Sequence, residues 1–279
     1  MTAIYKSEAG AEQIRRRYHR ALATWPMPAE HVRVPTREGE TFVVVSGPPE
    51  APPLLLLHGS GANTAMWRDD VATWAHHFRT YAVDVIGEPG DSAPSRPALD
   101  SGAHALWLDD VLEGLGLAQT AIVGASLGGW LALDYAVRRP QRVTRLALLC
   151  PGGIGRQKTG WILPALLLRP FGRWGLRRSA RFVTGLDTPG AGPALDTVVL
   201  TFSQFKPRTE RLPVFGDDAL ARLGMPVLVI AGERDAMFDS RDTARRAHRC
   251  IPHARVDLLP GVGHAVLGQA DALLAFLRG

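Results

Sequence analysis

The stretch that decides the fold is residues 120–129, Thr-Ala-Ile-Val-Gly-Ala-Ser-Leu-Gly-Gly. A short apolar run typical of a strand ends here in the pattern Gly-x-Ser-x-Gly, and residues 127–139 continue with the periodicity of a helix. A serine on so tight a turn crowds the neighbouring backbone, so Gly124 and Gly128 are expected to prevent clashes that side chains would cause. The pattern predicts that Ser126 projects from the turn as a nucleophile; the alternative is a purely structural glycine-rich turn.

Strand-like and helical segments alternate on both sides of this turn. Such alternation favours an α/β fold with a mostly parallel central sheet and helices on both faces. The run 54–57 is apolar throughout, as in a strand covered on both faces, and residues 31–35 and 41–46 are predicted to form a hairpin around Gly39. The other predicted strands are 80–85, 120–124, 143–150, 225–231 and 255–259, and the predicted helices are 64–77, 101–115, 127–139, 241–249 and 270–278.

Residues 151–218 interrupt the alternation with many prolines and glycines, so we expect short, broken helices there. We interpret this segment as a helical cap, or lid, inserted into an α/β core made of residues 1–150 and 219–279. It holds ten Lys and Arg against five Asp and Glu, whereas the rest of the chain has 22 of each sign. The whole net charge of +5 therefore lies in this segment.

Four arginines of the predicted cap recur every four residues, although the prolines and glycines between them argue against one continuous helix. Three interpretations are open: a solvated outer face, contact with an anionic membrane surface, or attraction of an acidic substrate. We expect the solvated face, with the apolar run 161–168 on the opposite side, where it lines an acyl pocket over Ser126. The arginines are Arg169, Arg173, Arg177 and Arg181.

A serine nucleophile needs a base and an orienting acid, because its hydroxyl is weakly nucleophilic at neutral pH. His264 lies in a glycine-rich loop after the last predicted strand, whereas His248 and His253 fall within a helix and before a strand. Asp235 follows the strand 225–231 and is the predicted acid. Asp239 precedes a helical run and is interpreted as its N-cap, and Glu233 lies too close to the strand end.

The turn at residues 58–61, His-Gly-Ser-Gly, follows the strand 54–57 and is predicted to aim a backbone N–H at the carbonyl oxygen of a bound ester. With the N–H of Leu127, this donor would form a two-donor oxyanion hole. Ser60 is the predicted first donor and Gly61 the alternative; a plain glycine turn is the structural alternative. His58 is expected to brace the turn and to take no part in catalysis.

Taken in order, these motifs resemble the α/β-hydrolase fold superfamily, and the chain is similar to small bacterial carboxylesterases. The closer likeness lies in Leu56-Leu57-His58-Gly59, Met66-Trp67 and Tyr81-Ala82-Val83-Asp84; Ala125 departs from the larger residue that many relatives carry. The resemblance implies a serine hydrolase that cleaves carboxylic esters through an acyl-enzyme, with a Ser126–His264–Asp235 triad and no cofactor. A serine at the turn argues against the branches that use a carboxylate nucleophile.

Two other functions remain open on the same fold: hydrolysis of a carbon–carbon bond in diketone-like substrates, and non-catalytic binding of a small ligand. A chain of 279 residues that is 46% hydrophobic and 21% charged can bury a sizeable core, and it has no run long enough to span a membrane. With no secretory signal and two cysteines expected to be unpaired, the prediction is a cytoplasmic protein. Neither a metal-binding motif nor a phosphate-binding loop is present, so we expect no metal. The basic net charge indicates nucleic acid only weakly, so we expect no nucleic-acid partner. The resemblance implies a small hydrophobic ester as substrate.

Overall fold

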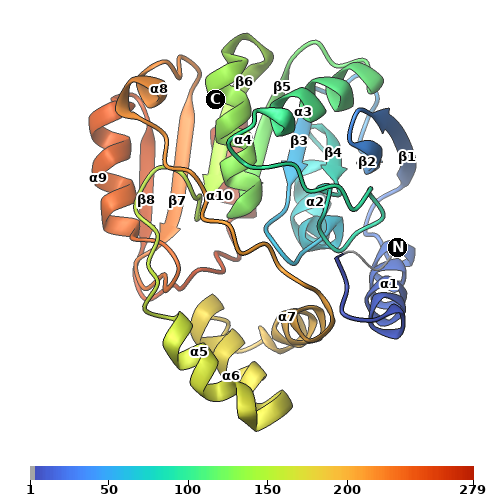
Figure 1. The fold of residues 1–279 in the computed structure, drawn as a ribbon. Coiled ribbons are helices and arrows are strands. Elements are labelled where there is room, and N and C mark those ends of the chain that lie inside the picture. The colour runs from blue at the N-terminus through green and yellow to red at the C-terminus, as the bar shows by residue number, and fades with distance from the viewer. Residues whose placement is uncertain (1–3) are drawn as a thin grey trace.

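The computed structural model describes residues 4–279 and contains an eight-stranded sheet with helices on both faces (Figure 1). The spatial order is β1-β2-β4-β3-β5-β6-β7-β8. The hairpin β1–β2 and the pair β2–β4 are antiparallel, and every other pair is parallel. The strands are β1 Ala29–Thr36, β2 Gly39–Ser46, β3 Pro53–Leu57, β4 Arg79–Val83, β5 Thr120–Ala125, β6 Val143–Leu149, β7 Val227–Gly232 and β8 Arg255–Leu259.

The predicted fold class is confirmed, and every predicted strand lies within two residues of its predicted ends. The apolar runs form the centre of the sheet: all positions of β5 and β7 are buried. β7 begins at Val227 instead of residue 225, because Pro226 has no N–H to donate to the ladder. The hairpin turn at Gly39 also lies where it was predicted, with Thr36 paired to Gly39.

Helices cover the two faces of the sheet with separate apolar clusters. Side chains of α3, α4, α8 and α9 pack on one face, and those of α1, α2 and α10 pack on the other. The predicted helix 64–77 is in fact a 3-10 turn, Thr64–Trp67, followed by the shorter α2. The Asp84 carboxylate accepts the N–H of Thr64 (2.8 Å) and ties this end to the sheet. The helices are α1 Glu8–Ala23, α2 Arg68–Trp74, α3 Ala103–Gly114, α4 Leu127–Arg138, α5 Ile162–Leu168, α6 Gly172–Thr184, α7 Gly192–Gln204, α8 Asp217–Ala221, α9 Ser240–Cys250 and α10 Ala270–Arg278.

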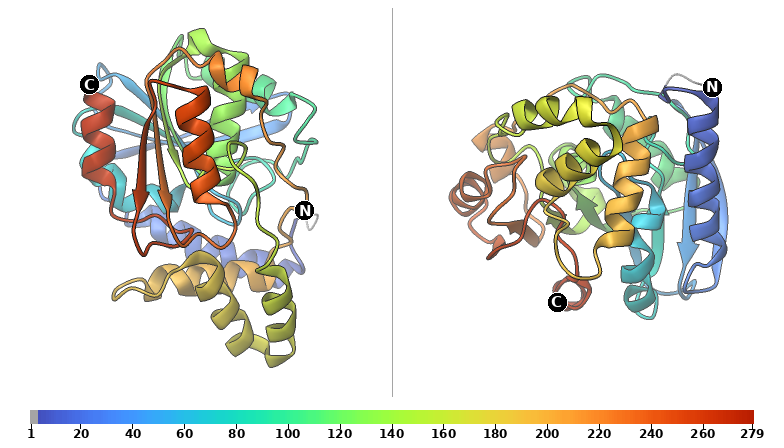
Figure 2. Two further views of the ribbon diagram at one scale, coloured as in Figure 1. Left: turned by 90° about the vertical axis from the view of Figure 1, so that its left-hand side faces the viewer. Right: turned by 90° about the horizontal axis from the view of Figure 1, so that it is seen from below.

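The segment between β6 and β7 forms α5, α6 and α7 at the edge of the sheet where the parallel strands end (Figures 1 and 2). The predicted break falls at Arg169–Phe171 and Gly172, where the chain turns between α5 and α6. Gly175 does not interrupt α6; a Cβ there would lie 1.8 Å from the Leu168 carbonyl oxygen, so glycine allows the two helices to pack closely. α7 packs on α1 through a small cluster that includes Tyr5 and Phe205.

Two features bear on the predicted class of protein. Both cysteines, Cys150 and Cys250, are buried and unpaired, as predicted. Over residues 4–279, no helix combines the length and the apolar character that crossing a membrane requires.

Candidate active site

Ser126 lies between β5 and α4 with φ 51° and ψ −109°, a backbone conformation that non-glycine residues seldom adopt. Glycine is required at positions 124 and 128 for the steric reason that was predicted. A Cβ on Gly124 would lie 2.4 Å from the carbonyl oxygen of Gly128, and one on Gly128 would lie 2.1 Å from that of Leu57. The turn therefore forms only with glycine at both positions, and it places the Ser126 side chain at the N-terminus of α4.

The structure brings Ser126, His264 and Asp235 together from the loops after β5, β8 and β7. His264 Nε2 lies 3.0 Å from Ser126 Oγ, and His264 Nδ1 lies 2.8 Å from Asp235 Oδ2. Asp235 is 2% exposed, and its Oδ1 accepts the N–H groups of Met237 (2.7 Å) and Phe238 (3.0 Å). These bonds fix the carboxylate, so its second oxygen can hold the imidazole in one orientation and one tautomer.

The structure does not bring the rival candidates to this site. Asp239 caps α9 by accepting the N–H three residues further on (3.1 Å), which confirms its predicted role. Glu233 forms an ion pair with Arg241 (2.9 Å). His248 lies within α9, and the Nε2 atom of His253 lies 2.9 Å from a backbone carbonyl oxygen.

The turn at residues 58–61 lies against Ser126: a Cβ on Gly59 would come within 3.4 Å of the serine Cβ. Among the described residues, the N–H groups of Ser60 and Leu127 make no hydrogen bond. Leu127 is the first residue of α4, where N–H groups have no acceptor inside the helix and the helix dipole favours negative charge. Both predicted donors are therefore available to an oxygen atom bound beside Ser126.

His58 braces this turn, as predicted. Its Nε2 accepts the N–H of Val85 (2.9 Å), and its Nδ1 lies 2.9 Å from the carbonyl oxygen of Gly59. The side chain is fully buried, and that burial lowers the pKa of His58 to about 4. A neutral imidazole that accepts at Nε2 and donates at Nδ1 satisfies both contacts, so His58 ties the turn to the segment after β4.

Glu88 is the residue that sequence analysis missed. Its Oε2 accepts the N–H of Gly61 (2.6 Å) and the hydroxyl of Ser60 (3.2 Å), whereas its Oε1 is buried without a partner among the described residues. Burial raises the pKa of Glu88 to about 7, although the Gly61 N–H and the charges of Arg96 and Arg208 oppose the rise. The bond to Glu88 occupies the Gly61 N–H, so the geometry favours Ser60 over Gly61 as the first donor.

Residues of α6, of α7 and of the loop before α5 contact the loops of the site. The carbonyl oxygen of Thr184, at the end of α6, accepts the N–H of Ala265 (2.7 Å), next to His264. The ring of Phe202 in α7 lies 2.7 Å from the Cβ position of Gly61, and Lys158 Nζ donates to the Asp235 carbonyl oxygen (2.9 Å). The segment between β6 and β7 therefore supports the base, the acid and the donor turn.

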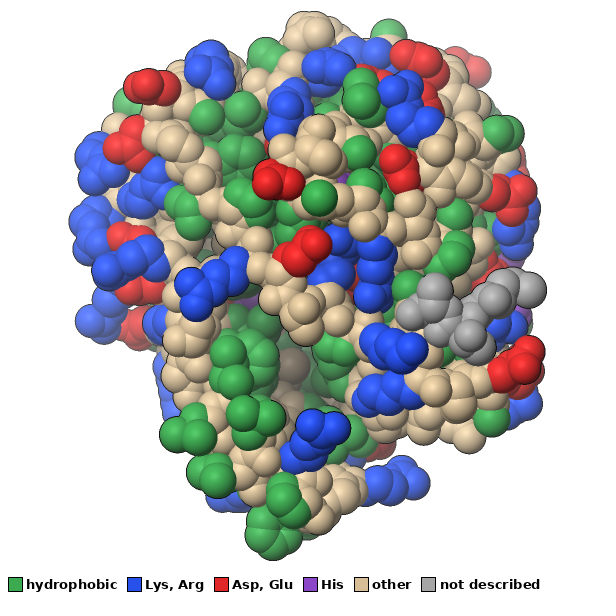
Figure 3. Space-filling view, viewed as in Figure 1, with side chains coloured by type: hydrophobic (Ala, Val, Ile, Leu, Met, Phe, Trp, Pro, Cys, Tyr) green, Lys and Arg blue, Asp and Glu red, His purple; other side chains and the backbone are tan. Residues whose placement is uncertain are grey.

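A cavity of about 400 Å³ lies beside the acid and the base, between α5, α6 and the loops at residues 234–236 and 261–263. Figure 3 shows a hollow on this side of the molecule with apolar side chains around it. The cavity is lined by Pro164, Ala165, Leu168, Arg178, Ser179, Arg181, Phe182, Gly185, Asp187, Arg234, Ala236, Gly261 and Gly263.

The expectation that the run 161–168 faces inward and the arginines face outward holds only in part: Pro164, Ala165 and Leu168 line the cavity, and Arg169 and Arg173 are exposed and do not line it. Leu163, Leu166 and Leu167 are 64%, 55% and 65% exposed, while Arg178 and Arg181 line the cavity together with apolar residues of α5. In a helix of only seven residues the leucines occupy every side, so those pointing away from the cavity have no protein surface to pack against.

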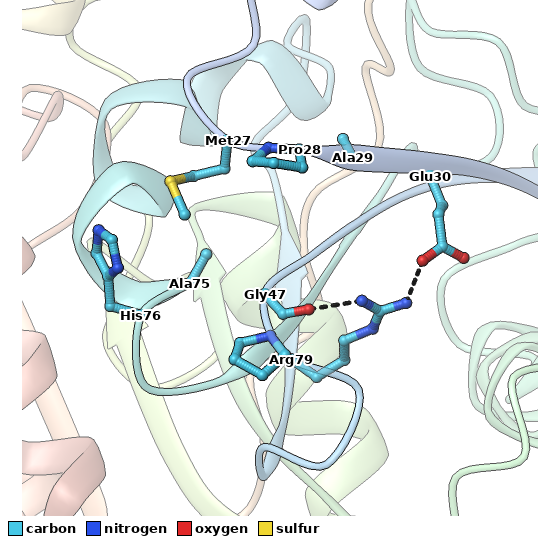
Figure 4. A pocket seen from close by; sticks show the side chains of 9 residues that line it. Met27, Pro28, Ala29, Glu30, Gly47, Ala75, His76 and Arg79 are labelled. Atoms are coloured by element: carbon cyan, nitrogen blue, oxygen red, sulfur yellow. Dashed lines mark hydrogen bonds and ion pairs between the residues drawn. The ribbon is translucent and has the colours of Figure 1, made fainter.

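A second cavity, of about 420 Å³, lies at the amino end of β4, at the opposite edge of the sheet (Figure 4). Its one arginine, Arg79, is neutralised by Glu30 (2.6 Å) and also donates to the carbonyl oxygen of Gly47 (2.6 Å). The cavity lies at the end of the strands opposite to Ser126, so it has no part in the chemistry described above. Among residues 4–279 there is no cluster of three metal-ligating side chains.

Comparison with known proteins gives consistent matches along the chain. The family described as alpha/beta hydrolase fold matches residues 52–271. Carboxylesterase YbfK of Bacillus subtilis is 33% identical over 94% of this chain and 92% of its own length, and its crystal structure superposes with a TM-score of 0.85, at 31% identity over 96% of this chain and 98% of that one.

Two further matches are also esterases. The protein named uncharacterized carboxylesterase nap, also from Bacillus subtilis, is 31% identical over 89% of this chain and 85% of its own length. The crystal structure of naproxen esterase from the same organism has a TM-score of 0.80 and 28% identity, and it covers 98% of this chain and 97% of that one.

Proposed function

This chain belongs to the α/β-hydrolase fold family and is a carboxylic ester hydrolase, and from that premise we propose that it cleaves esters through an acyl-enzyme formed on Ser126. The observation that carries the proposal is the continuous hydrogen-bonded chain from Ser126 Oγ through His264 to Asp235, with separations of 3.0 Å and 2.8 Å. A nucleophile, a base and an orienting acid at hydrogen-bonding distance are what acyl transfer requires.

In the proposed reaction, His264 Nε2 accepts the Ser126 hydroxyl proton as Oγ bonds to the ester carbonyl carbon. His264 then gives that proton to the departing oxygen, which leaves as an alcohol, and the acyl group stays on Oγ. Water loses a proton to His264 and bonds to the acyl carbon; the bond to Oγ breaks, and the proton returns to Ser126. Asp235 holds the imidazole tautomer and stabilises its positive charge.

We propose that the N–H groups of Ser60 and Leu127 stabilise the oxyanion that forms in each step. The proposal is supported by their lack of hydrogen bonds in the described chain and by the position of Leu127 at the start of α4. Glu88 acts on this pair as a positioning residue: by accepting the Gly61 N–H and the Ser60 hydroxyl, it holds the Ser60 side chain and the Ser60–Gly61 peptide, next to the peptide that carries the Ser60 N–H.

Residues 151–218 are proposed to form a cap over the site, between core segments 1–150 and 219–279. Support comes from the position of α5 to α7 at the carboxyl edge of the sheet and from their contacts with the site loops. The residues at 217–218 begin α8, whose Leu220 is buried in the core, so the helices that cover the site are α5, α6 and α7. The adjacent cavity has charged residues as well as apolar ones in its lining, and its apolar part suits the hydrophobic group of a small ester.

The test compares wild type with Ser126→Ala on chromogenic esters of increasing acyl length, and it adds a vinylogous diketone to the panel. We expect the variant to lose about 10³-fold or more in kcat, and a fluorophosphonate probe to label Ser126 alone. Turnover of the diketone in preference to every ester would identify a carbon–carbon bond hydrolase, which uses the same three residues. Unchanged turnover in Ser126→Ala would overturn the mechanism.

A further inference from the structure

The outer surface of α5 and α6 concentrates the exposed apolar side chains of the molecule. Of the twelve large hydrophobic side chains that are exposed in residues 4–279, seven lie here. Figure 3 shows hydrophobic side chains gathered at the lower end of the molecule. We call this surface the α5–α6 face. It consists of Ile162, Leu163, Leu166, Leu167, Phe171, Trp174 and Phe182.

The same surface carries charge of one sign. From residue 156 to residue 181 the chain has seven basic residues and no acidic one. Of the arginines between residues 169 and 181, only Arg177 has an ion-pair partner within the described chain, Asp196; four others are exposed and unpaired. Elsewhere in the molecule arginines commonly pair with carboxylates. The unpaired ones are Arg169, Arg173, Arg178 and Arg181.

The position of these helices leaves the face open. In the left view of Figure 2, α5 and α6 lie at the lower end of the molecule, and α5 has no buried residue. α7, by contrast, is held by α1 and by its own apolar cluster with α6. The site cavity lies on the inner side of α5 and α6 and is bordered by Arg178, Arg181 and Phe182; the other residues of the face do not line it and have no role in the chemistry proposed above.

We propose that the α5–α6 face docks on an anionic lipid–water interface. Leucine, phenylalanine and tryptophan side chains enter the boundary between headgroups and acyl chains, and arginines beside them reach the phosphates. Trp174, with the guanidinium of Arg178 5.9 Å from its ring centroid, has the amphipathic character that suits such a boundary.

The charge pattern favours a lipid surface over a second copy of this chain. Two copies that paired symmetrically through this face would bring the same arginines together with no carboxylate between them, and like charges oppose that contact. An anionic bilayer supplies the missing negative charge and also accepts the apolar side chains. Docking would hold the cavity beside the site close to lipid-soluble esters. This consequence rests on the proposed function, but the proposal that the face binds an anionic interface does not.

The experiment measures sedimentation of the full chain with vesicles of pure phosphatidylcholine and with vesicles containing about 30% phosphatidylglycerol, at low salt and at about 0.5 M NaCl. We expect at least about tenfold tighter binding to the anionic vesicles, most of it lost at high salt. Leu163→Ser/Leu167→Ser should weaken binding to them about tenfold or more. Leu106→Ser/Leu258→Ser, with two exposed leucines elsewhere, is the matched apolar control and should bind as wild type does.

A second pair of variants tests the contribution of the arginines to docking. It replaces the first test if Leu163→Ser/Leu167→Ser fails to fold. Arg173→Gln/Arg178→Gln should lose anionic-vesicle binding, whereas Arg16→Gln/Arg20→Gln, on the exposed side of α1, should keep it. Equal binding to both vesicle types, or none to either, would overturn the proposal. So would a dimer in light scattering that Leu163→Ser/Leu167→Ser dissociates, because the face would then be covered by a second copy.

Discussion

Two aspartates four residues apart, Asp235 and Asp239, show what a single carboxylate contributes at this site. Both accept backbone N–H groups, but only Asp235 has an oxygen left for His264. Asp239 uses its oxygens on the start of α9 and on Arg156 (3.5 Å). The residue type is the same, and the position relative to the strand end decides its chemistry.

The first prediction separates these two carboxylates. Asp235→Asn keeps the shape but favours the wrong tautomer of His264, so kcat should fall by up to about 10⁴-fold. Asp239→Asn should change kcat little, because asparagine caps helices as well as aspartate does. Steady-state rates on one ester decide the matter, and the opposite ranking would make Asp239 the acid.

The second prediction concerns Glu88 and stability. Its pKa rises from the usual 4.5 to about 7 because the side chain is buried. Between these values the unfolded chain binds fewer protons than the folded one, so the free energy of unfolding should fall as pH rises through this window. Glu88→Gln has no ionisation at this position. Between pH 5 and pH 8 its melting temperature should therefore fall by several degrees less than that of the wild type. Parallel melting curves for the two proteins would contradict a raised pKa.

The same residue has an effect on rate that distinguishes positioning from bulk stability. Glu88→Ala removes the acceptor for the Gly61 N–H, and kcat should fall about tenfold with little change in KM, because a loosened donor acts in the transition state. Glu88→Gln retains a side-chain oxygen and should recover most of the rate. Equal losses in both variants would mean that the charge, and not the hydrogen bond, matters.

At the scale of elements, the sequence predicted what depends on local pattern. The strands follow from apolar runs, the turn at Ser126 follows from two glycines and a serine, and the N-cap of α9 follows from Asp239. Local pattern could not orient α5, because its leucines point in several directions and tertiary packing decides which of them are covered. Nor could it find Glu88, a lone carboxylate in a turn whose partner, Gly61, lies 27 residues away.

The third prediction is that the end of α6 holds the loop of the base. Gly185 has φ +72°, and a Cβ there would lie 2.6 Å from the Cα of Gly263, next to His264. Gly185→Ala should displace that loop and lower kcat by about 10–100-fold, since small misplacements of catalytic groups are costly. Gly190→Ala is the matched control, because Gly190 has φ +89° but nothing within 4 Å of its Cβ position. Equal rates in the two variants would show that α6 and the base are independent.

At the scale of the whole molecule, the excess positive charge lies at one end, on the segment between β6 and β7. Charges on a surface act through a field that salt screens within about 8 Å at physiological ionic strength. The proposed substrate is neutral. The positively charged end of the molecule should therefore affect binding to anionic surfaces and anionic ligands, and it should hardly affect turnover of a dissolved neutral ester.

The fourth prediction follows from that separation. The kcat/KM of a short, water-soluble neutral ester should change by less than about twofold between 50 mM and 0.5 M NaCl. An ester with a carboxylate on its acyl chain is the comparison and should lose more, because Arg178, Arg181 and Arg234 line the cavity beside the site. A steep fall for the neutral ester would mean that the arginines take part in turnover itself.

The strand that precedes the base is the least protected part of the site. β8 forms one edge of the sheet and has no fully buried residue, whereas β7, before Asp235, is buried at all six positions. If β8 separates briefly from β7, Ser126 and Asp235 stay in place and only His264 leaves the site. Heat inactivation should therefore precede melting of the core, and amide protons of β8 should exchange with solvent before those of β5 and β7.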